Sequence, residues 1–169
     1  MPKTLIAAAL LSLLVPAAIA QESPRIEINK QAPIVAHSEI YIDAALAAVW
    51  SVLADIDSWT SYMPEFASAR LDGPMQPGTM LLWEPQGQYV ESRLVAVETD
   101  KLLVWNGSGG AVHVWELTSS GSGTVLRNDE SIDDAAWSAG PTPEAGSEFL
   151  TQSLSVWDDR IAEQVKLTR

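Results

Sequence analysis

Cysteine is absent from this 169-residue chain, and histidine occurs only at positions 37 and 113. Without cysteine there is neither a disulfide framework nor a thiol that could carry a lipid anchor, so the core must stabilise the fold. Two histidines without any thiolate also argue against a zinc site. We therefore expect no metal, and no motif for an organic cofactor is present.

Basic residues are scarce as well, with 10 Lys and Arg against 22 Asp and Glu and a net charge of −12. Such a field repels phosphate groups and anionic lipid surfaces, which argues against a nucleic-acid partner. The glycine-rich run Gly107-Ser108-Gly109-Gly110 lacks the spacing of a P-loop or a dinucleotide fingerprint. No nucleophile elbow is visible either.

Only one long apolar run occurs, and it lies at the N-terminus. Lys3 precedes the apolar stretch Leu5 to Val15, and Ala18-Ile19-Ala20 has the small-x-small pattern of a cleavage site. The stretch is short for a membrane span, which needs about 20 residues. We expect residues 1–20 to be a signal peptide, the mature chain to start at Gln21, and the protein to be periplasmic or secreted, without stable membrane insertion.

The mature chain has the length of one domain. Residues 21–33 are polar with two prolines, and Ile26 and Ile28 alternate with polar neighbours. This N-terminal arm is either a short edge strand or mobile. The remaining residues, 34–169, form the domain, and no internal repeat is visible.

The domain opens with a strand followed by two short helices. Ser38, Ile40 and Ile42 alternate with polar residues, as in a half-buried strand. Asp43 then has the position of a helix cap, and Asp57 that of a cap for a second helix through Tyr62. The apolar stripe of the first helix comprises Leu46, Val49, Trp50, Leu53 and Ile56.

Short strands separated by turn residues make up the middle of the chain. Asn106-Gly107 is a strong signal for a two-residue hairpin turn. Consecutive strands with turns between them predict an antiparallel, meandering sheet of six or seven strands. The further strands are predicted at Phe66–Leu71, Thr79–Trp83, Tyr89–Val97, Leu102–Trp105, Ala111–Leu117 and Thr124–Ile132.

The chain ends in a loop and a long helix. Asp133 to Gly146 is rich in proline and glycine, and loops of this length are often lids. Glu148 to Leu167 is predicted to be a helix. Its apolar stripe comprises Leu150, Leu154, Trp157, Ile161 and Val165.

Several motifs carry a resemblance to a known family. The run from Ile42 to Trp59 resembles the opening of the START-like (SRPBCC, or Bet v 1-like) superfamily, in its bacterial polyketide cyclase/dehydrase-related branch, with Ala45 in place of the usual proline. Later motifs occur in the same order as in this family, and the resemblance covers about residues 34–169. These motifs are Gly78-Thr79 with Trp83, Arg93-Leu94-Val95, Lys101 to Trp105, His113 to Leu117 and Gly123-Thr124.

This resemblance implies an α+β helix-grip fold, in which the curved antiparallel sheet wraps around the long C-terminal helix and the two short helices follow the first strand. The resemblance says little about function, because ligand carriers, cyclases, dehydratases and cofactor chaperones share this fold. It also implies that the face of the strand bearing His113, Trp115 and Leu117 looks into a cavity between sheet and helix.

Six of the seven tryptophans divide into two groups. Trp50, Trp115 and Trp157 lie on apolar stripes and are predicted to be core. Trp83 and Trp105 lie at strand ends, and Trp137 lies in the predicted lid. These last three are either ligand contacts at an opening or plain packing.

Polar residues on neighbouring strands supply the candidate chemistry. If Leu126 points inward, Asn128 and Glu130 do too, and Glu130 would form an acid/base pair with His113. A lone inward histidine is more often a hydrogen-bonded core residue. His37 is expected to be exposed. The register of the strand after Tyr89 stays open, since a slip of one residue inverts its faces.

We therefore expect an exported binding protein for a small hydrophobic molecule, lipid-like, aromatic or polyketide-like. The alternative is a cyclase/dehydratase-like enzyme with His113, Glu130 or Asn128 as the catalytic candidates. A third possibility is an interaction module that uses the Trp137 loop. The predicted ligand-binding residues are Trp83, Tyr89, Trp105, His113, Trp115, Asn128, Trp137, Leu150, Leu154 and Trp157.

Overall fold

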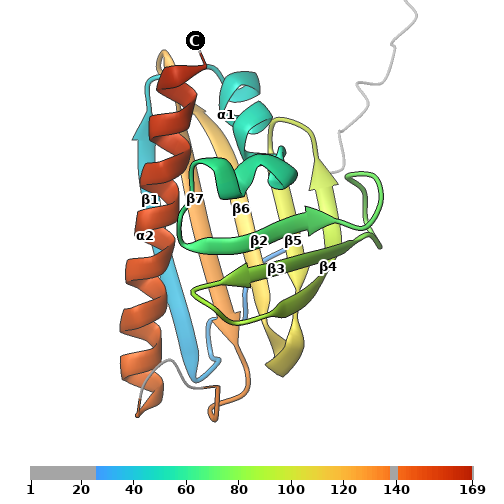
Figure 1. Cartoon of the computed structure of the whole chain (residues 1–169). Coiled ribbons are helices and arrows are strands. Elements are labelled where there is room, and N and C mark those ends of the chain that lie inside the picture. Colours follow the sequence, from blue (N-terminus) through green and yellow to red (C-terminus); the bar gives the residue numbers. More distant parts are fainter. Residues whose placement is uncertain (1–25, 138–140, 169) are drawn as a thin grey trace, which may run out of the picture.

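Seven antiparallel strands form one curved sheet that wraps around a single long helix (Figure 1). The computed structural model describes residues 26–137 and 141–168, so the predicted signal peptide lies outside the described residues. The strand order is β1-β7-β6-β5-β4-β3-β2. The elements are β1 (Ile34–Ile42), α1 (Leu46–Leu53), the 3₁₀ helix η1 (Ile56–Ser61), β2 (Phe66–Leu71), β3 (Met80–Pro85), β4 (Val90–Glu98), β5 (Leu102–Asn106), the 3₁₀ helix η2 (Ser108–Gly110), β6 (Val112–Ser120), β7 (Gly123–Ile132) and α2 (Pro143–Leu167).

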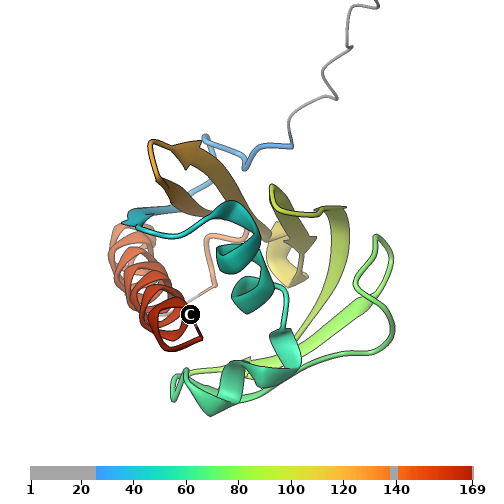
Figure 2. The same ribbon diagram turned by 90° about the horizontal axis from the view of Figure 1, so that it is seen from above.

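This architecture confirms the predicted helix-grip fold. The long helix α2 fills the concave side of the sheet beside β1, and α1 closes one end of the groove between α2 and the sheet (Figures 1 and 2). The predicted stripe of α2 is buried along its whole length. These contacts explain why the amphipathic pattern of this helix was so regular, since one face meets the core and the other meets solvent.

The helix α2 begins at Pro143, earlier than the predicted start at Glu148. Thr142 caps it by accepting a hydrogen bond from the backbone N–H of Ala145 at 3.3 Å. Proline is favoured in the first helical turn, where its missing N–H costs nothing. The predicted loop is therefore shorter, and part of it, residues 138–140, lies outside the described residues.

Neither of the two predicted aspartate caps forms. Asp43 lies in a tight turn before α1, which has Ala45 as its N-cap residue, and it accepts a hydrogen bond from Ser122 Oγ at 3.3 Å. Asp57 accepts the backbone N–H of Leu71 at 3.0 Å, tying η1 to β2. Both carboxylates thus bind groups distant in sequence, which a local capping rule does not include.

The expected two-residue turn at Asn106-Gly107 is also wrong. Asn106 pairs with Val112, so the connection between β5 and β6 is longer and contains η2. Gly107 has φ −139°, which is extended backbone and not the positive φ of a type I′ turn. A two-residue turn occurs instead between β6 and β7, where Ser120 pairs with Gly123.

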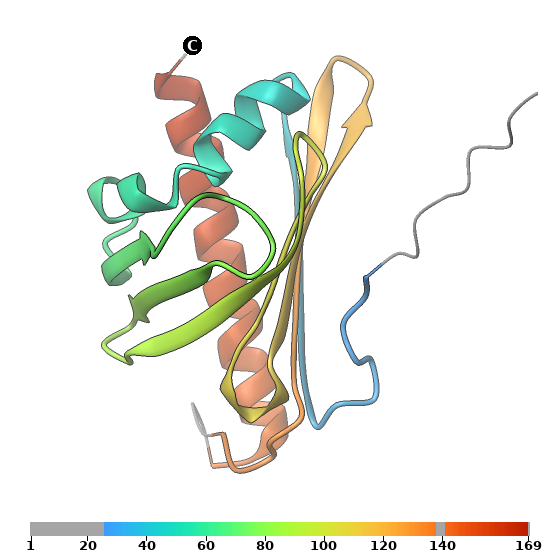
Figure 3. The ribbon, with the colours of Figure 1, turned by 90° about the vertical axis from the view of Figure 1, so that its right-hand side faces the viewer.

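The described part of the N-terminal arm, residues 26–33, forms no strand and runs over the outer face of the sheet (Figure 3). Ile28 packs there in a small second cluster with Leu102, Val104 and Val114. This cluster explains why β6 has apolar residues on both faces. The arm is therefore held on the sheet by apolar contacts.

The inner face of the sheet is decided by the register of the strands. Leu126 is buried against the core, so Asn128 and Glu130 also point inward, as the conditional prediction required. In β4 the inward residues include Ser92 and Leu94, while Arg93 is exposed. The open question on this strand is thus resolved.

Aromatic rings fill much of the concave side. Trp59 from η1 lies at their centre, with ring centroids 5.5 Å from Phe66, 6.2 Å from Trp105 and 6.4 Å from Trp115. Phe66 also contacts Trp157 at 5.0 Å. Such tilted pairs stabilise a core beyond the area they bury. The predicted core positions Trp50, Trp115 and Trp157 are confirmed as buried.

Candidate functional site

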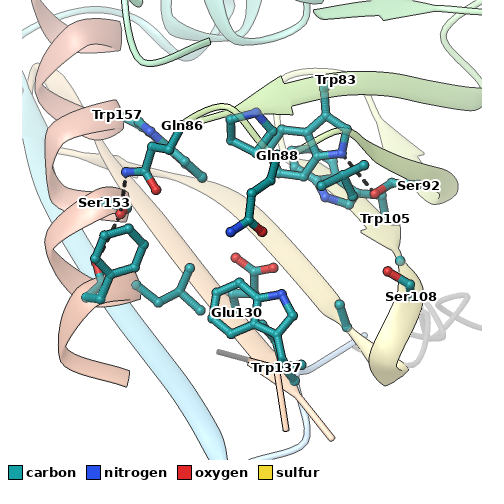
Figure 4. Close-up of a pocket in the computed structure, with 17 residues that line it drawn as sticks. Trp83, Gln86, Gln88, Ser92, Trp105, Ser108, Glu130, Trp137, Ser153 and Trp157 are labelled. Atoms are coloured by element: carbon teal, nitrogen blue, oxygen red, sulfur yellow. Dashed lines mark hydrogen bonds between the residues drawn. The ribbon is translucent and has the colours of Figure 1, made fainter. Parts of the chain in front are cut away.

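A pocket lies at the end of the groove opposite α1, between the β3–β4 turn, the first half of α2 and the end of β7 (Figure 4). Its volume is about 80 Å³. The lining residues are Trp83, Pro85, Gln86, Gln88, Val90, Ser92, Trp105, Gly107, Ser108, Ala111, Glu130, Ile132, Trp137, Phe149, Leu150, Ser153 and Trp157.

Four tryptophans dominate this lining. Trp83 packs edge-on against Trp105 and Trp157, with centroid distances of 5.7 Å and 6.0 Å. The indole N–H of Trp83 donates to Ser92 Oγ at 3.1 Å. Trp137 lies across the pocket from Trp83 and Trp105 (Figure 4) and is half-buried against the core. The three tryptophans expected at an opening therefore all line the pocket, although Trp83 and Trp105 are buried and do not form an exposed rim.

The predicted contact between His113 and Glu130 is present at the pocket wall. His113 and Glu130 are direct cross-strand partners, and His113 Nδ1 lies 3.1 Å from Glu130 Oε2. The imidazole stacks on Trp105 with a centroid distance of 4.4 Å and an interplanar angle of 20°. Glu130 lines the pocket, whereas His113 lies behind it and is fully buried. This geometry can hold or move one proton between the two side chains.

A second buried polar pair lies deeper, between β7 and α2. Asn128 Nδ2 donates to Asp158 Oδ1 at 2.9 Å. Burial raises the pKa of the Asp158 carboxyl from 3.8 to about 6, while hydrogen bonds from Ser38 and Asn128 and the proximity of His113 oppose the rise. Desolvation dominates because the charged form loses its water.

Several side-chain atoms around these two pairs have no protein partner. Among the residues that the structure describes, they include His113 Nε2, Trp115 Nε1, Trp157 Nε1 and Asn128 Oδ1. Buried polar atoms of this kind are satisfied by internal water or by a ligand. The core behind the pocket is therefore polar at its centre in spite of its tryptophans.

The predicted ligand-binding residues fall into three groups. Trp83, Trp105, Trp137, Leu150 and Trp157 line the pocket. His113, Trp115, Asn128 and Leu154 are buried behind that lining.

Tyr89 is the exception. It is 62% exposed, and its hydroxyl donates to Glu91 Oε1 at 3.1 Å. Tyr89 precedes β4, whose inward residues are those at even positions from 90 to 94, so its side chain belongs to the opposite set.

Sequence reasoning missed the polar residues at the pocket mouth. Gln86 Nε2 donates to Ser153 Oγ at 2.9 Å and so joins the β3–β4 turn to α2. Gln88 and Ser108 also line the pocket. Gln86 and Gln88 lie in a turn and Ser108 lies in the short helix η2, where no periodicity indicates the direction of a side chain. Asp158 was missed as well, because a charged residue beside the apolar stripe of a helix is normally a solvated one.

Among the described residues, no group of three or more His, Asp or Glu side chains is placed to hold a metal ion. No helix within the described ranges is long and apolar enough to cross a membrane.

Solved structures share this fold at low sequence identity. The crystal structure of Ara h 8.0201 is 17% identical with a TM-score of 0.61, covering 80% of this chain and 98% of that one. A START superfamily protein from Mycobacterium smegmatis is 12% identical with a TM-score of 0.66, and the match covers 80% of this chain and 99% of that one. The di-domain ARO/CYC protein StfQ from the steffimycin biosynthetic pathway is 16% identical with a TM-score of 0.62, covering 80% of this chain and 50% of that one.

No functionally curated protein matches the sequence. The profile of one protein family matches residues 33–155, which is most of the described domain. The fold, the register of the inner face and the pocket between sheet and helix agree with the resemblance seen in the sequence. The chain therefore belongs to the family described as polyketide cyclase / dehydrase and lipid transport.

Proposed function

We propose that this protein binds a small hydrophobic molecule in the pocket between the sheet and α2. The observation that carries the proposal is the composition of the wall. Among its described residues, four indole rings and several aliphatic groups surround a single titratable side chain, Glu130. Ligand sites have this character, with mostly apolar walls and few polar groups that orient the ligand.

The volume limits the size of the ligand. The pocket holds about 80 Å³, whereas a cavity that binds benzene has about 150 Å³. At about 24 cal/mol per Å³, an empty pocket of this size costs only about 2 kcal/mol, so the protein tolerates the free state. An aromatic ligand requires a shift of a lining side chain, and Trp137 is the half-buried one of the four lining tryptophans.

Native mass spectrometry of the purified protein tests this proposal. We expect a co-purifying small molecule that is lost on denaturation, or binding of added aromatic compounds at micromolar to millimolar concentration. Leu150→Asp, which places a charge in the apolar wall, should abolish binding, while the exposed Glu148→Gln next to it should not. A protein that takes up none of a panel of small aromatic and aliphatic compounds would refute the proposal.

A second candidate function is that of a cyclase/dehydratase-like enzyme. The observation in its favour is the His113–Glu130 contact, which supplies a general acid or base at the pocket wall. Only Glu130 reaches the pocket directly, so this carboxylate would take the proton from a ligand, and its contact with His113 Nδ1 would orient it. Conversion of a polyketide-like substrate that depends on Glu130 would establish the enzyme over the carrier.

We also propose that the protein is exported, on the strength of Lys3, the apolar run and Ala18-Ile19-Ala20. N-terminal sequencing of the protein from its natural host should then begin at Gln21. A start at Met1 or Pro2 would contradict export.

A further inference from the structure

We propose that the ligand of this pocket is a small organic cation, an amine or ammonium group attached to an apolar body. The inference rests on the proposed binding function and names the chemical class of the ligand. It follows from a buried carboxylate and aromatic faces at the same pocket.

Among the described residues that line the pocket, Glu130 is the only charged one. Its side chain is 9% exposed, and Figure 4 shows its carboxylate directed toward the middle of the pocket, between Trp137 and the tryptophans of the opposite wall. A buried carboxylate binds a cation with a charge-assisted hydrogen bond and repels an anion. Ligands that carry a carboxylate or phosphate are therefore disfavoured.

The charge of the pair with His113 is consistent with a cationic ligand. When the imidazole carries one proton, on Nδ1, it donates to Glu130 Oε2, and the pair keeps one net negative charge. A bound ammonium group would neutralise this negative charge from the pocket side.

The aromatic walls reinforce the preference. Trp83 and Trp105 lie on one side of the carboxylate and Trp137 on the other (Figure 4). Indole faces attract cations within about 6 Å of the ring centroid, and they do so most strongly in desolvated sites. The polar groups at the mouth, Gln86 and Gln88, are neutral. The net charge of −12 also favours the approach of a cation.

Isothermal titration calorimetry with three probes of similar size tests the inference: benzylamine, benzyl alcohol and benzoate. Benzylamine should bind at least about tenfold more tightly than benzyl alcohol, the ratio expected for a charge-assisted hydrogen bond to a buried group. Benzoate should bind most weakly. In Glu130→Gln the advantage of benzylamine should fall to less than about threefold, while Glu148→Gln, which removes an exposed charge from α2, should keep it.

A second variant keeps the test valid if Glu130→Gln does not fold. Trp137→Leu retains an apolar side chain but removes the indole face, so it should weaken benzylamine about three- to thirtyfold more than benzyl alcohol. Equal or tighter binding of benzyl alcohol by the unmodified protein would overturn the cation inference and leave the binding function intact. Failure of all three probes, together with no co-purifying molecule, would overturn both.

Discussion

Asp158 offers the sharpest test of the buried polar core. The substitution Asp158→Asn preserves the shape of the side chain, and its amide oxygen can still accept the hydrogen bond from Asn128 Nδ2, which spans 2.9 Å to Asp158 Oδ1. It removes the ionisable carboxyl group of a residue that is only 1% exposed. The change therefore isolates the effect of ionisation.

The magnitude follows from the raised pKa of Asp158, 3.8 in a model peptide and about 6 in the folded chain. Between these values the unfolded state releases its proton first, so it binds fewer protons than the folded state, and the free energy of unfolding falls as pH rises. Each pKa unit corresponds to about 1.4 kcal/mol. The group therefore costs the folded state about 3 kcal/mol above pH 6 and nothing below pH 3.8.

The assay is urea unfolding of both proteins from pH 4 to pH 7.5. At pH 4 the variant and the unmodified protein should differ by less than about 1 kcal/mol, because the folded-state carboxyl is neutral there and the unfolded-state carboxyl is only near the midpoint of its titration. At pH 7.5 the stability advantage of Asp158→Asn over the unmodified protein should be about 2–3 kcal/mol larger than at pH 4. Titrating groups that do not interact with Asp158 cancel in the difference.

Asp159→Asn is the matched control, because Asp159 is the neighbouring carboxylate and is exposed. It should shift stability by a few tenths of a kcal/mol at every pH. A difference between Asp158→Asn and the unmodified protein that does not change between pH 4 and pH 7.5 would refute the desolvation argument.

Three further predictions concern the core, a close backbone approach and the pocket wall. Trp50→Ala should lower the free energy of unfolding by about 3–5 kcal/mol, as for other buried aromatics, and a loss below about 1 kcal/mol in urea unfolding would mean that α1 does not pack on the core. Gly123→Ala should lower the free energy of unfolding by about 1–3 kcal/mol, because its Cβ would lie 2.5 Å from the carbonyl oxygen of Ile42. Thermal unfolding measures this loss, with Ser122→Ala as the control variant. Equal melting temperatures of the two variants would contradict the prediction. His113→Gln should reduce turnover by about 10²- to 10⁴-fold if the protein is an enzyme. If it is a carrier, the same change should weaken ligand affinity or stability by about 1–3 kcal/mol. If enzyme kinetics, binding calorimetry and unfolding are all unchanged, the contact with Glu130 has no role.

The elements of this fold were predictable from the sequence because the local periodicity of apolar residues indicates strands and helices. The alternation in β1 and the stripe of α2 each repeat over many residues, and both were identified with the correct buried face. The prediction for β7 was conditional on Leu126, and one buried residue then determined the direction of Asn128 and Glu130. The His113–Glu130 pair was predictable for the same reason, since neighbouring strands of a meander bring their inward faces together.

The tertiary structure alone decided the features that depend on distant contacts. Asp43 and Asp57 bind partners in other elements, so local capping rules misassigned them. The desolvation of Asp158 arises where α2 meets β7 and β1, and nothing in its own helix marks it. The pocket is the space left after the large aromatic rings have packed, and its volume depends on all of them together. Periodicity specifies which face of an element is buried, whereas the packing of those faces determines how much room and how much water remain between them.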